Sequence, residues 1–326
     1  MRTAWRTWRS VLAMLACMAV APAESLAQAF PSRPIRLVVG LSPGGSTDVT
    51  SRMVAQKLGE QFGQNVVVEN RTGAGGMIAM EKVATSPADG YTLLVMPASG
   101  AVLPVLRAKL PFDLERDLAP VSLLVTGPYV LVIHPSVAAR NIAELIDLAR
   151  SQPGKLSYGS DGVGSASYLA GELFKRMAKV DIIHVPYKGG AESAIANAAG
   201  HVHISYPSLT SAQSLIAAGK LKPLAVTSLR RTSLAPTLPT LDESGLTGYD
   251  RTGWIGLLAP AHVPRDVMAR LHAAIVKVLN TPEMKDALNK QGQEPQTNTP
   301  QQFAAFIRAE VKQNANLIKL TGIKVD

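Results

Sequence analysis

The chain has 326 residues and a formal net charge of +9, with 47% hydrophobic and 17% charged residues. This composition excludes a disordered chain, and the length predicts two lobes rather than one ordinary domain. The basic residues are scattered and form no polybasic run interleaved with aromatic residues, which argues against nucleic-acid binding. A mildly positive field instead favours small anions that arrive by diffusion.

The first 29 residues have the pattern of a secretory signal peptide. A segment with three arginines precedes the apolar run VLAMLACMAVAPA, which is too short to span a bilayer, and AQA at 27–29 fits a cleavage site. We therefore expect an exported protein that begins at Phe30 and carries a charge of +7. The alternatives are an uncleaved membrane anchor, or a lipid anchor at Cys17, the only cysteine. Cleavage would leave no cysteine for disulfides, catalysis or metal binding.

Strand and helix patterns alternate from Ile35 onward. The runs IRLVVG, NVVVEN and GYTLLVMPAS predict strands, with helices after SPGGSTD and after GAGG. Val49, Met53, Leu58 and Phe62 fall at helical spacing in the first helix, and Gly63 is its predicted end. The apolar run 121–135 is broken at Gly127-Pro128, which predicts a strand, a hinge and a second strand.

The alternation then begins again. A helix is predicted from the cap Asn141, with Glu144 three residues later, and another in YLAGELFKRMAK; KLSYGS, DIIHVPY, HVHISY and LKPLAVTS read as strands. TGWIGLLAP, 252–260, is apolar, and the rest reads as helix without strands of its own. Such a tail must pack on an existing sheet. We therefore predict an α/β protein with lobe 1 formed by 30–126 plus 252–326, lobe 2 by 127–251, and a cleft between them.

Two loops of similar design carry the predicted chemistry. SPGGSTD and GSDGVGSAS each lie between a strand and a helix, where glycines allow close approach and unpaired N–H groups favour an anion. The alternative is that Ser46 and Ser165 merely cap their helices. Asp48 lies four residues before Arg52, so an ion pair within the helix competes with a role in ligand binding.

Two enzymatic or metal alternatives are weaker. GLSPG, 40–44, fits the G-x-S-x-G nucleophile motif of serine hydrolases at Ser42, but Pro43 lacks the N–H that the oxyanion hole requires. His201 and His203 would share one face of a strand, yet no third metal ligand has a recognisable spacing. No nucleotide-binding glycine motif stands at the expected place, so we expect no cofactor.

The mature chain resembles the Bug-type periplasmic receptors of tripartite tricarboxylate transporters. The resemblance is carried by FPSRPIRLVVGLSPGGSTDVTSRMVAQKL, VVVENRTGAGGMIAMEKVATSPADGYTLLV, KLSYGSDGVGSASYLAGELF, VPYKGGAESAIANAAGHV and GWIGLLAPAHVP. It implies a type II periplasmic-binding fold with an interlobe cleft and two crossover strands, no catalysis, and a monomer that delivers a small carboxylate to membrane permease subunits. The ligand contacts that it implies are Pro43, Gly44, Gly45, Ser46, Asp48, Ser99, Ser160, Gly164, Ser165, Tyr168 and Tyr187.

Three positions depart from the family pattern. Tyr168 stands where the family usually has His, Met77 where it has Asn, and Tyr206-Pro207 near a frequent Asp. These changes predict a plain or partly apolar carboxylate rather than an amino acid or a cation. Transport is the leading interpretation, and the alternative is a receptor that signals through a membrane partner without transport; the sequence does not separate the two.

Overall fold

The computed structural model describes residues 30–321, so the predicted signal peptide and Cys17 lie outside the described residues. Contacts group the residues from Arg33 onward into one unit, separate from residues 1–32, and only that unit is described below. Its strands form two sheets.

The first sheet has the strand order β11-β4-β10-β3-β1-β2. Its strands are β1 (Ile35–Val39), β2 (Val66–Asn70), β3 (Thr92–Pro97), β4 (Leu118–Pro128), β10 (Thr252–Pro260) and β11 (Glu294–Pro295). β1 pairs in parallel with both β2 and β3, whereas β10 is antiparallel to β3 and β4. β1 and β3 are buried almost throughout, as expected for central strands covered on both faces.

The second sheet has the order β7-β6-β8-β5-β9. Its strands are β5 (Val130–Ile133), β6 (Ser157–Ser160), β7 (Ile183–Pro186), β8 (Ile204–Ser205) and β9 (Lys222–Val226). β6 is parallel to β7 and β8, and β5 is antiparallel to β8 and β9. The sheet therefore mixes both pairings, with the parallel strands at the β7 edge.

Helices flank both sheets. With the first sheet are α2 (Ser46–Phe62), α3 (Met77–Ala84), α4 (Leu103–Leu106), α9 (Arg265–Leu279), α10 (Pro282–Lys290) and α11 (Pro300–Thr321). With the second are α5 (Ile142–Ser151), α6 (Ala166–Ala178), α7 (Gly190–Ala198) and α8 (Leu209–Ala217). α11 packs on β4 and also contacts α6, so the C-terminal helix touches elements of both sheets. Among the described residues, no helix combines the length and the apolarity needed to cross a membrane.

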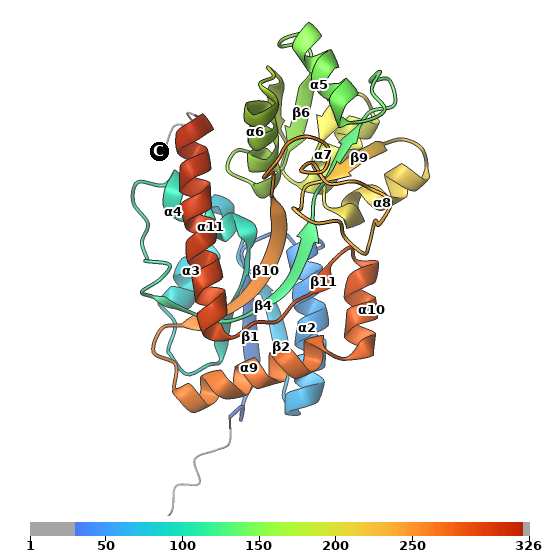
Figure 1. Cartoon of the computed structure of the whole chain (residues 1–326). Helices are drawn as coiled ribbons and strands as arrows, with labels where there is room; N and C mark the ends of the chain where they lie inside the picture. The colour runs from blue at the N-terminus through green and yellow to red at the C-terminus, as the bar shows by residue number, and fades with distance from the viewer. Residues whose placement is uncertain (1–29, 322–326) are drawn as a thin grey trace, which may run out of the picture. The chain divides into compact units, whose positions relative to one another are not determined.

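Two chain passages connect the sheets. β4 and β10 are paired along their whole length, from Pro260 with Leu118 to Thr252 with Pro128, and Figure 1 shows them leaving the first sheet together. The break after Pro128 separates β4 from β5, as the Gly127-Pro128 interruption predicts. Both passages carry a glycine, and a Cβ on Gly253 would lie only 2.9 Å from the Gly127 carbonyl oxygen. The tight pairing therefore requires glycine there.

Helix ends follow the local sequence. Gly63 adopts a left-handed conformation with φ of 64° and ends α2, as predicted. The Asn141 side chain accepts a 2.9 Å hydrogen bond from the Glu144 N–H and so caps α5. Thr281 caps α10 in the same way, followed by proline at the first helical position.

The structure corrects several predictions. α8 and β11 were not predicted, and β11 contradicts a C-terminal segment without strands. β8 contains only Ile204 and Ser205, so His201 and His203 lie before the strand and not on one of its faces. Of the four apolar residues that fall at helical spacing in α2, only Leu58 is fully buried. Polar residues near the start of α2 occupy the buried face instead.

Candidate functional site

Three turns meet at one edge of the first sheet. Because β2, β1 and β3 are parallel neighbours, the turns that follow them lie at the same end of the sheet. They are the loop 40–45, the 3-10 turn Ala74–Gly76 and the 3-10 turn Ala98–Ala101. A Cβ on Gly40 would lie 2.7 Å from the Cα of Gly76, so the first two turns touch through their backbones.

The Asp48 side chain stabilises the loop 40–45 through hydrogen bonds. Its Oδ2 atom accepts hydrogen bonds of 2.9 Å from the Gly44 N–H and from Nε of Arg52, and its Oδ1 accepts one of 2.9 Å from Asn70. Burial works against the charge, but these partners outweigh it and lower the pKa of Asp48. The carboxylate is only 2% exposed and is directed into its own loop. The predicted ion pair with Arg52 is present, and the Gly44 N–H already has an acceptor.

The first turn of α2 contains backbone N–H groups that have no hydrogen-bond partner within the helix. The first backbone hydrogen bond at this end runs from the Val49 N–H to the Gly45 carbonyl, at 2.9 Å. The preceding N–H groups, of Ser46, Thr47 and Asp48, therefore have no partner within the helix. Pro43, Gly44, Gly45 and Ser46 are exposed around them. This helix end combines unpaired donors with partial positive charge.

Gln293 holds the Ser46 hydroxyl. Its Nε2 donates to Ser46 Oγ at 2.7 Å, and its Oε1 accepts from Thr50 Oγ1 at 2.6 Å. Gly45 is the N-cap of α2 and Ser46 is not, which corrects the capping alternative for this serine. Gln293 directly precedes β11, whose residues pair with β4 close to the sheet crossing.

The second loop follows β6. Ser160 is fully buried; its Oγ lies 2.6 Å from Nε2 of His184 and accepts a 3.1 Å hydrogen bond from the Gly162 N–H. Ser165 accepts from the Tyr168 N–H at 3.1 Å and caps α6, as the capping alternative states. The Ser160 hydroxyl thus stabilises the loop, and the N–H groups of Ala166 and Ser167 have no partner within α6.

The short helix α4 contacts loops from both sheets. Gly164 is buried with φ of +80°, and a Cβ there would lie 2.1 Å from Cδ1 of Leu106. At the other end of α4, Cδ2 of Leu103 is 3.5 Å from the position of a Cβ on Gly75. Gly164 therefore supports the contact between loop and helix, and its burial leaves little surface for a ligand.

The remaining predicted contacts differ in exposure. Tyr168 is buried in the hydrophobic core around β5, β6 and α6, with its ring centroid 4.5 Å from that of His184, and burial raises the pKa of its phenol. Tyr187 is half-buried, and its N–H donates to the Ser160 carbonyl at 2.9 Å. Ser99 is half-buried in the turn after β3. Ser99 and Tyr187 remain accessible, whereas Tyr168 packs mainly against protein.

Three polar residues near the crossings were not singled out from the sequence. Asp161, in the second loop, is half-buried, and burial raises the pKa of its carboxyl to about 6. Tyr129 packs against the cores of both sheets, and burial followed by the charge of Asp161 raises its pKa. Arg251 is 6% exposed and donates to Asn314 at 3.0 Å. Only Asp161 had a sequence signal, as the one acid inside the motif GSDGVGSAS.

The alternative chemistries find little support in the geometry. Within residues 30–321, no histidine hydrogen-bonds to the Ser42 hydroxyl, and no group of three or more His, Cys, Asp or Glu side chains could hold a metal ion. Nδ1 of His203 instead accepts a 3.1 Å hydrogen bond from the Ser157 N–H.

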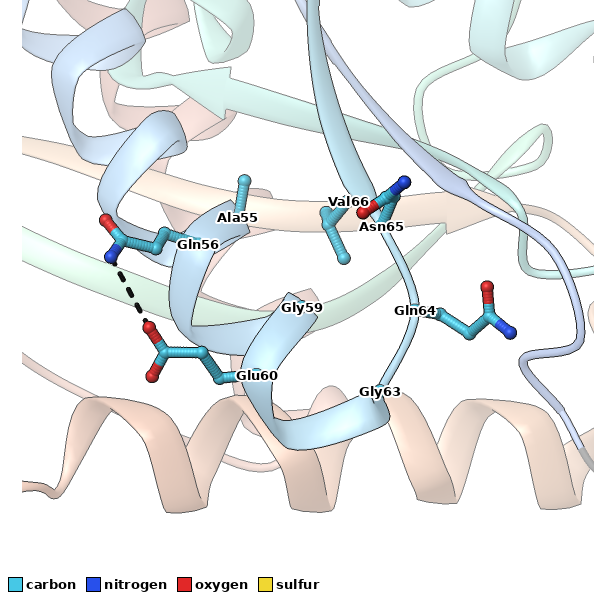
Figure 2. Close-up of a pocket in the computed structure, with 8 residues that line it drawn as sticks. All are labelled: Ala55, Gln56, Gly59, Glu60, Gly63, Gln64, Asn65 and Val66. Carbon is cyan, nitrogen blue, oxygen red and sulfur yellow. Dashed lines mark hydrogen bonds between the residues drawn. The ribbon is translucent and has the colours of Figure 1, made fainter.

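A surface pocket lies away from the loop 40–45 and the second loop. Figure 2 shows it between the last turns of α2 and the start of β2, where it has a volume of about 410 Å³. Glu60, its acidic residue, is paired with Lys57 at 2.9 Å. A helix C-terminus repels anions, so this hollow is a poor match for a carboxylate.

Known proteins share this architecture. Relatives include the UPF0065 protein of the tcbD-tcbE intergenic region of Pseudomonas sp. (strain P51), 38% identical over 95% of this chain and 93% of that protein. Among solved structures, R. palustris Rpa4515 with adipate has a TM-score of 0.83 and 34% identity, over 90% of this chain and 98% of that one. MatC (Rpa3494) from Rhodopseudomonas palustris with bound malate has a TM-score of 0.79 and 29% identity, over 89% and 100%.

The periplasmic binding protein BugD has a TM-score of 0.80 and 32% identity, over 90% of this chain and 99% of that one. These likenesses extend over nearly the whole described chain, and they confirm the predicted periplasmic-binding fold. The family model described as "Tripartite tricarboxylate transporter family receptor" matches residues 50–323. The chain therefore belongs to the tripartite tricarboxylate transporter receptor family.

Proposed function

We propose that this protein is a periplasmic receptor that captures a small carboxylate and delivers it to the membrane permease subunits of a tripartite tricarboxylate transporter, without catalysing a reaction. The observation that carries the proposal is the unpaired first turn of α2, where three N–H groups follow an exposed glycine loop. The similar structures that bind adipate and malate support a carboxylate as the ligand class. We further propose that the export signal at 1–29 is cleaved and that the receptor is monomeric.

The contacts that we propose for the ligand are backbone N–H groups and not serine hydroxyls. The Ser46, Thr47 and Asp48 N–H groups would bind one carboxylate, with Ala166 and Ser167 of α6 as donors from the second loop. Asp48 stabilises the loop 40–45 and does not itself contact the ligand, which the backbone N–H groups bind. Ser99 and Tyr187 would line the remaining space.

The test removes one backbone donor and leaves the fold intact. Ser46 is the first residue of α2, where proline is well tolerated, and Gly45 before it has φ of −75° and ψ of 165°, a conformation that suits a residue preceding proline. Ser46→Pro deletes the N–H and the hydroxyl, whereas the control Ser46→Ala deletes the hydroxyl alone. A charged hydrogen bond contributes about 1.5–3 kcal/mol, so we expect Ser46→Pro to bind carboxylates roughly 10- to 100-fold more weakly than Ser46→Ala.

Isothermal titration would first identify binders among adipate, malate, succinate and benzoate, and then compare the two variants. Equal affinities of Ser46→Pro and Ser46→Ala would contradict the proposed site.

Delivery is tested by uptake of the same labelled carboxylate into cells that contain the permease subunits, with and without the receptor. Uptake that does not depend on the receptor would contradict the transport role. An ester-hydrolysis assay of the wild type tests the hydrolase alternative.

A further inference from the structure

The C-terminal helix α11 is buried in the hydrophobic cores of both sheets. Phe303 and Ile307, near its start, belong to the core around β3, β4 and β10, which we call the first core. Leu317 and Ile318, in its last turns, belong to the core around β5, β6 and α6, the second core. α11 also contacts α6 directly, and Figure 1 shows the helix extending from the first sheet to α6. The helix is therefore a non-covalent connection between the sheets, in addition to the two chain passages.

Polar contacts fix the middle of α11 to the first sheet. Asn314 is fully buried; its Oδ1 accepts a 3.0 Å hydrogen bond from Arg251, just before β10, and its Nδ2 donates to the Ala101 carbonyl at 3.2 Å. One turn earlier in the helix, the Glu310 carboxylate accepts a 3.0 Å hydrogen bond from Nε1 of Trp254. A buried amide must keep its hydrogen-bond partners, because an unpaired polar group in the interior is costly. These contacts therefore fix the position of α11 along the first sheet.

The last turns of α11 bind the second core differently. The side chains of Leu317 and Ile318 are hydrocarbon and only 5% and 3% exposed, so their contact with the second core is apolar. Apolar contacts are non-directional, and their strength depends on the area that they remove from water. Losing them leaves no buried polar side chain unpaired, whereas losing the contacts of Asn314 does. The helix thus has a fixed part and a part that can be released.

The same arrangement brings the second loop against the first sheet. Val102, which follows the turn Ala98–Ala101, belongs to the second core, and Ala166, at the start of α6, belongs to the first core. Gly164 of the second loop lies against Leu106 of α4. The start of α6 therefore lies close to the turns of the first sheet only while the two sheets keep this arrangement, and the last turns of α11 stabilise it.

We propose that the last turns of α11 act as a latch: Leu317 and Ile318 hold the second sheet close to the first, and they leave the second core when the sheets move apart. The rest of the helix stays on the first sheet through Asn314 and the first core. A ligand bound by donors of both α2 and α6 needs the latched arrangement, so the latched fraction scales the apparent affinity. This link to affinity rests on the proposed function, whereas the latch itself does not.

Two isoleucines of α11 give a matched comparison. Ile318 and Ile307 are each 3% exposed, the former in the second core and the latter in the first. Ile318→Ala and Ile307→Ala remove the same atoms from the same helix, so both should lower the urea midpoint of unfolding. Only Ile318→Ala should increase the radius of gyration of the ligand-free full mature chain in small-angle X-ray scattering. It should also weaken the binding of adipate or malate roughly tenfold relative to Ile307→Ala.

The outcomes separate the latch from the proposed function. An equal radius of gyration in the two alanine variants, or an increase in Ile307→Ala alone, would overturn the latch. Equal affinities together with different scattering would overturn its link to binding. The milder pair Ile318→Val and Ile307→Val should show the same contrast with a smaller amplitude, and it serves if an alanine variant does not fold. Because the scattering needs no ligand, failure of the wild type to bind any carboxylate would overturn the proposed function and leave the test of the latch intact.

Discussion

Gly164 offers the sharpest test of how the second loop is built. Substitution by alanine imposes two separate penalties. A non-glycine residue in the left-handed region costs about 1–2 kcal/mol. The new Cβ would also lie 2.1 Å from Cδ1 of Leu106, and such overpacking costs about 1–3 kcal/mol. We therefore expect Gly164→Ala to lower the free energy of unfolding by about 2–5 kcal/mol.

Leu106→Ala separates the two penalties, because it removes the atom that the new Cβ would meet and leaves the backbone conformation unchanged. In that background Gly164→Ala should cost only the conformational penalty of about 1–2 kcal/mol. The coupling in the double-mutant cycle is then about 1–3 kcal/mol. Urea unfolding followed by circular dichroism would measure all four proteins. Equal costs of Gly164→Ala in the two backgrounds would refute the contact between the second loop and α4.

Three further predictions concern single side chains. Asp48→Asn should destabilise the protein by about 1.5–3 kcal/mol at pH 7 in urea unfolding, because it weakens the charged hydrogen bonds of a buried carboxylate whose partner Arg52 is half-exposed. Because the folded pKa of Asp48 is depressed, this difference should shrink as the pH falls below the usual aspartate range. A constant difference down to acid pH would contradict the role of its charge. Ser193→Ala should leave the free energy of unfolding unchanged or raise it by up to about 1 kcal/mol, because Ser193 Oγ is buried without a hydrogen-bond partner among the described residues; a clear loss of stability would refute this. Gln293→Ala should destabilise by about 1–3 kcal/mol and weaken carboxylate binding, since it leaves Thr50 without its side-chain partner and frees Ser46. Gln291→Ala, at a half-buried neighbouring position whose side chain hydrogen-bonds to neither Thr50 nor Ser46, should change neither.

Local features of the fold could be predicted from the sequence because they depend on neighbouring residues. The end of α2 at Gly63, the Asn141 cap and the Asp48–Arg52 pair each join residues within a few positions of one another. Buried central strands such as β1 and β3 were also predictable, because short, continuously apolar runs are typical of strands that are covered on both faces. These signals were sufficient for the α/β class and for the position of the glycine loops.

The parts that the sequence did not predict depend on contacts between distant segments. Gln293 reaches Ser46 across 247 positions, and no local pattern indicates such a hydrogen bond. Burial of Gly164 depends on Leu106, which belongs to a different element. The two-residue strand β11 is defined by its pairing with β4 and has no periodicity of its own. β8 was predicted within HVHISY, but its restriction to Ile204 and Ser205 was not. The same limit explains why Ser160 and Tyr168 could be placed in the loop region but not recognised as buried.

The internal bonding of Asp48 has a consequence for how the protein meets its ligand. Because one carboxylate accepts hydrogen bonds from Gly44, Arg52 and Asn70, the loop 40–45 already has a defined conformation before a ligand binds. The encounter then requires little ordering of backbone at this helix end, and ordering is one of the main entropic penalties of association. A preorganised loop therefore favours tight binding at low solute concentrations.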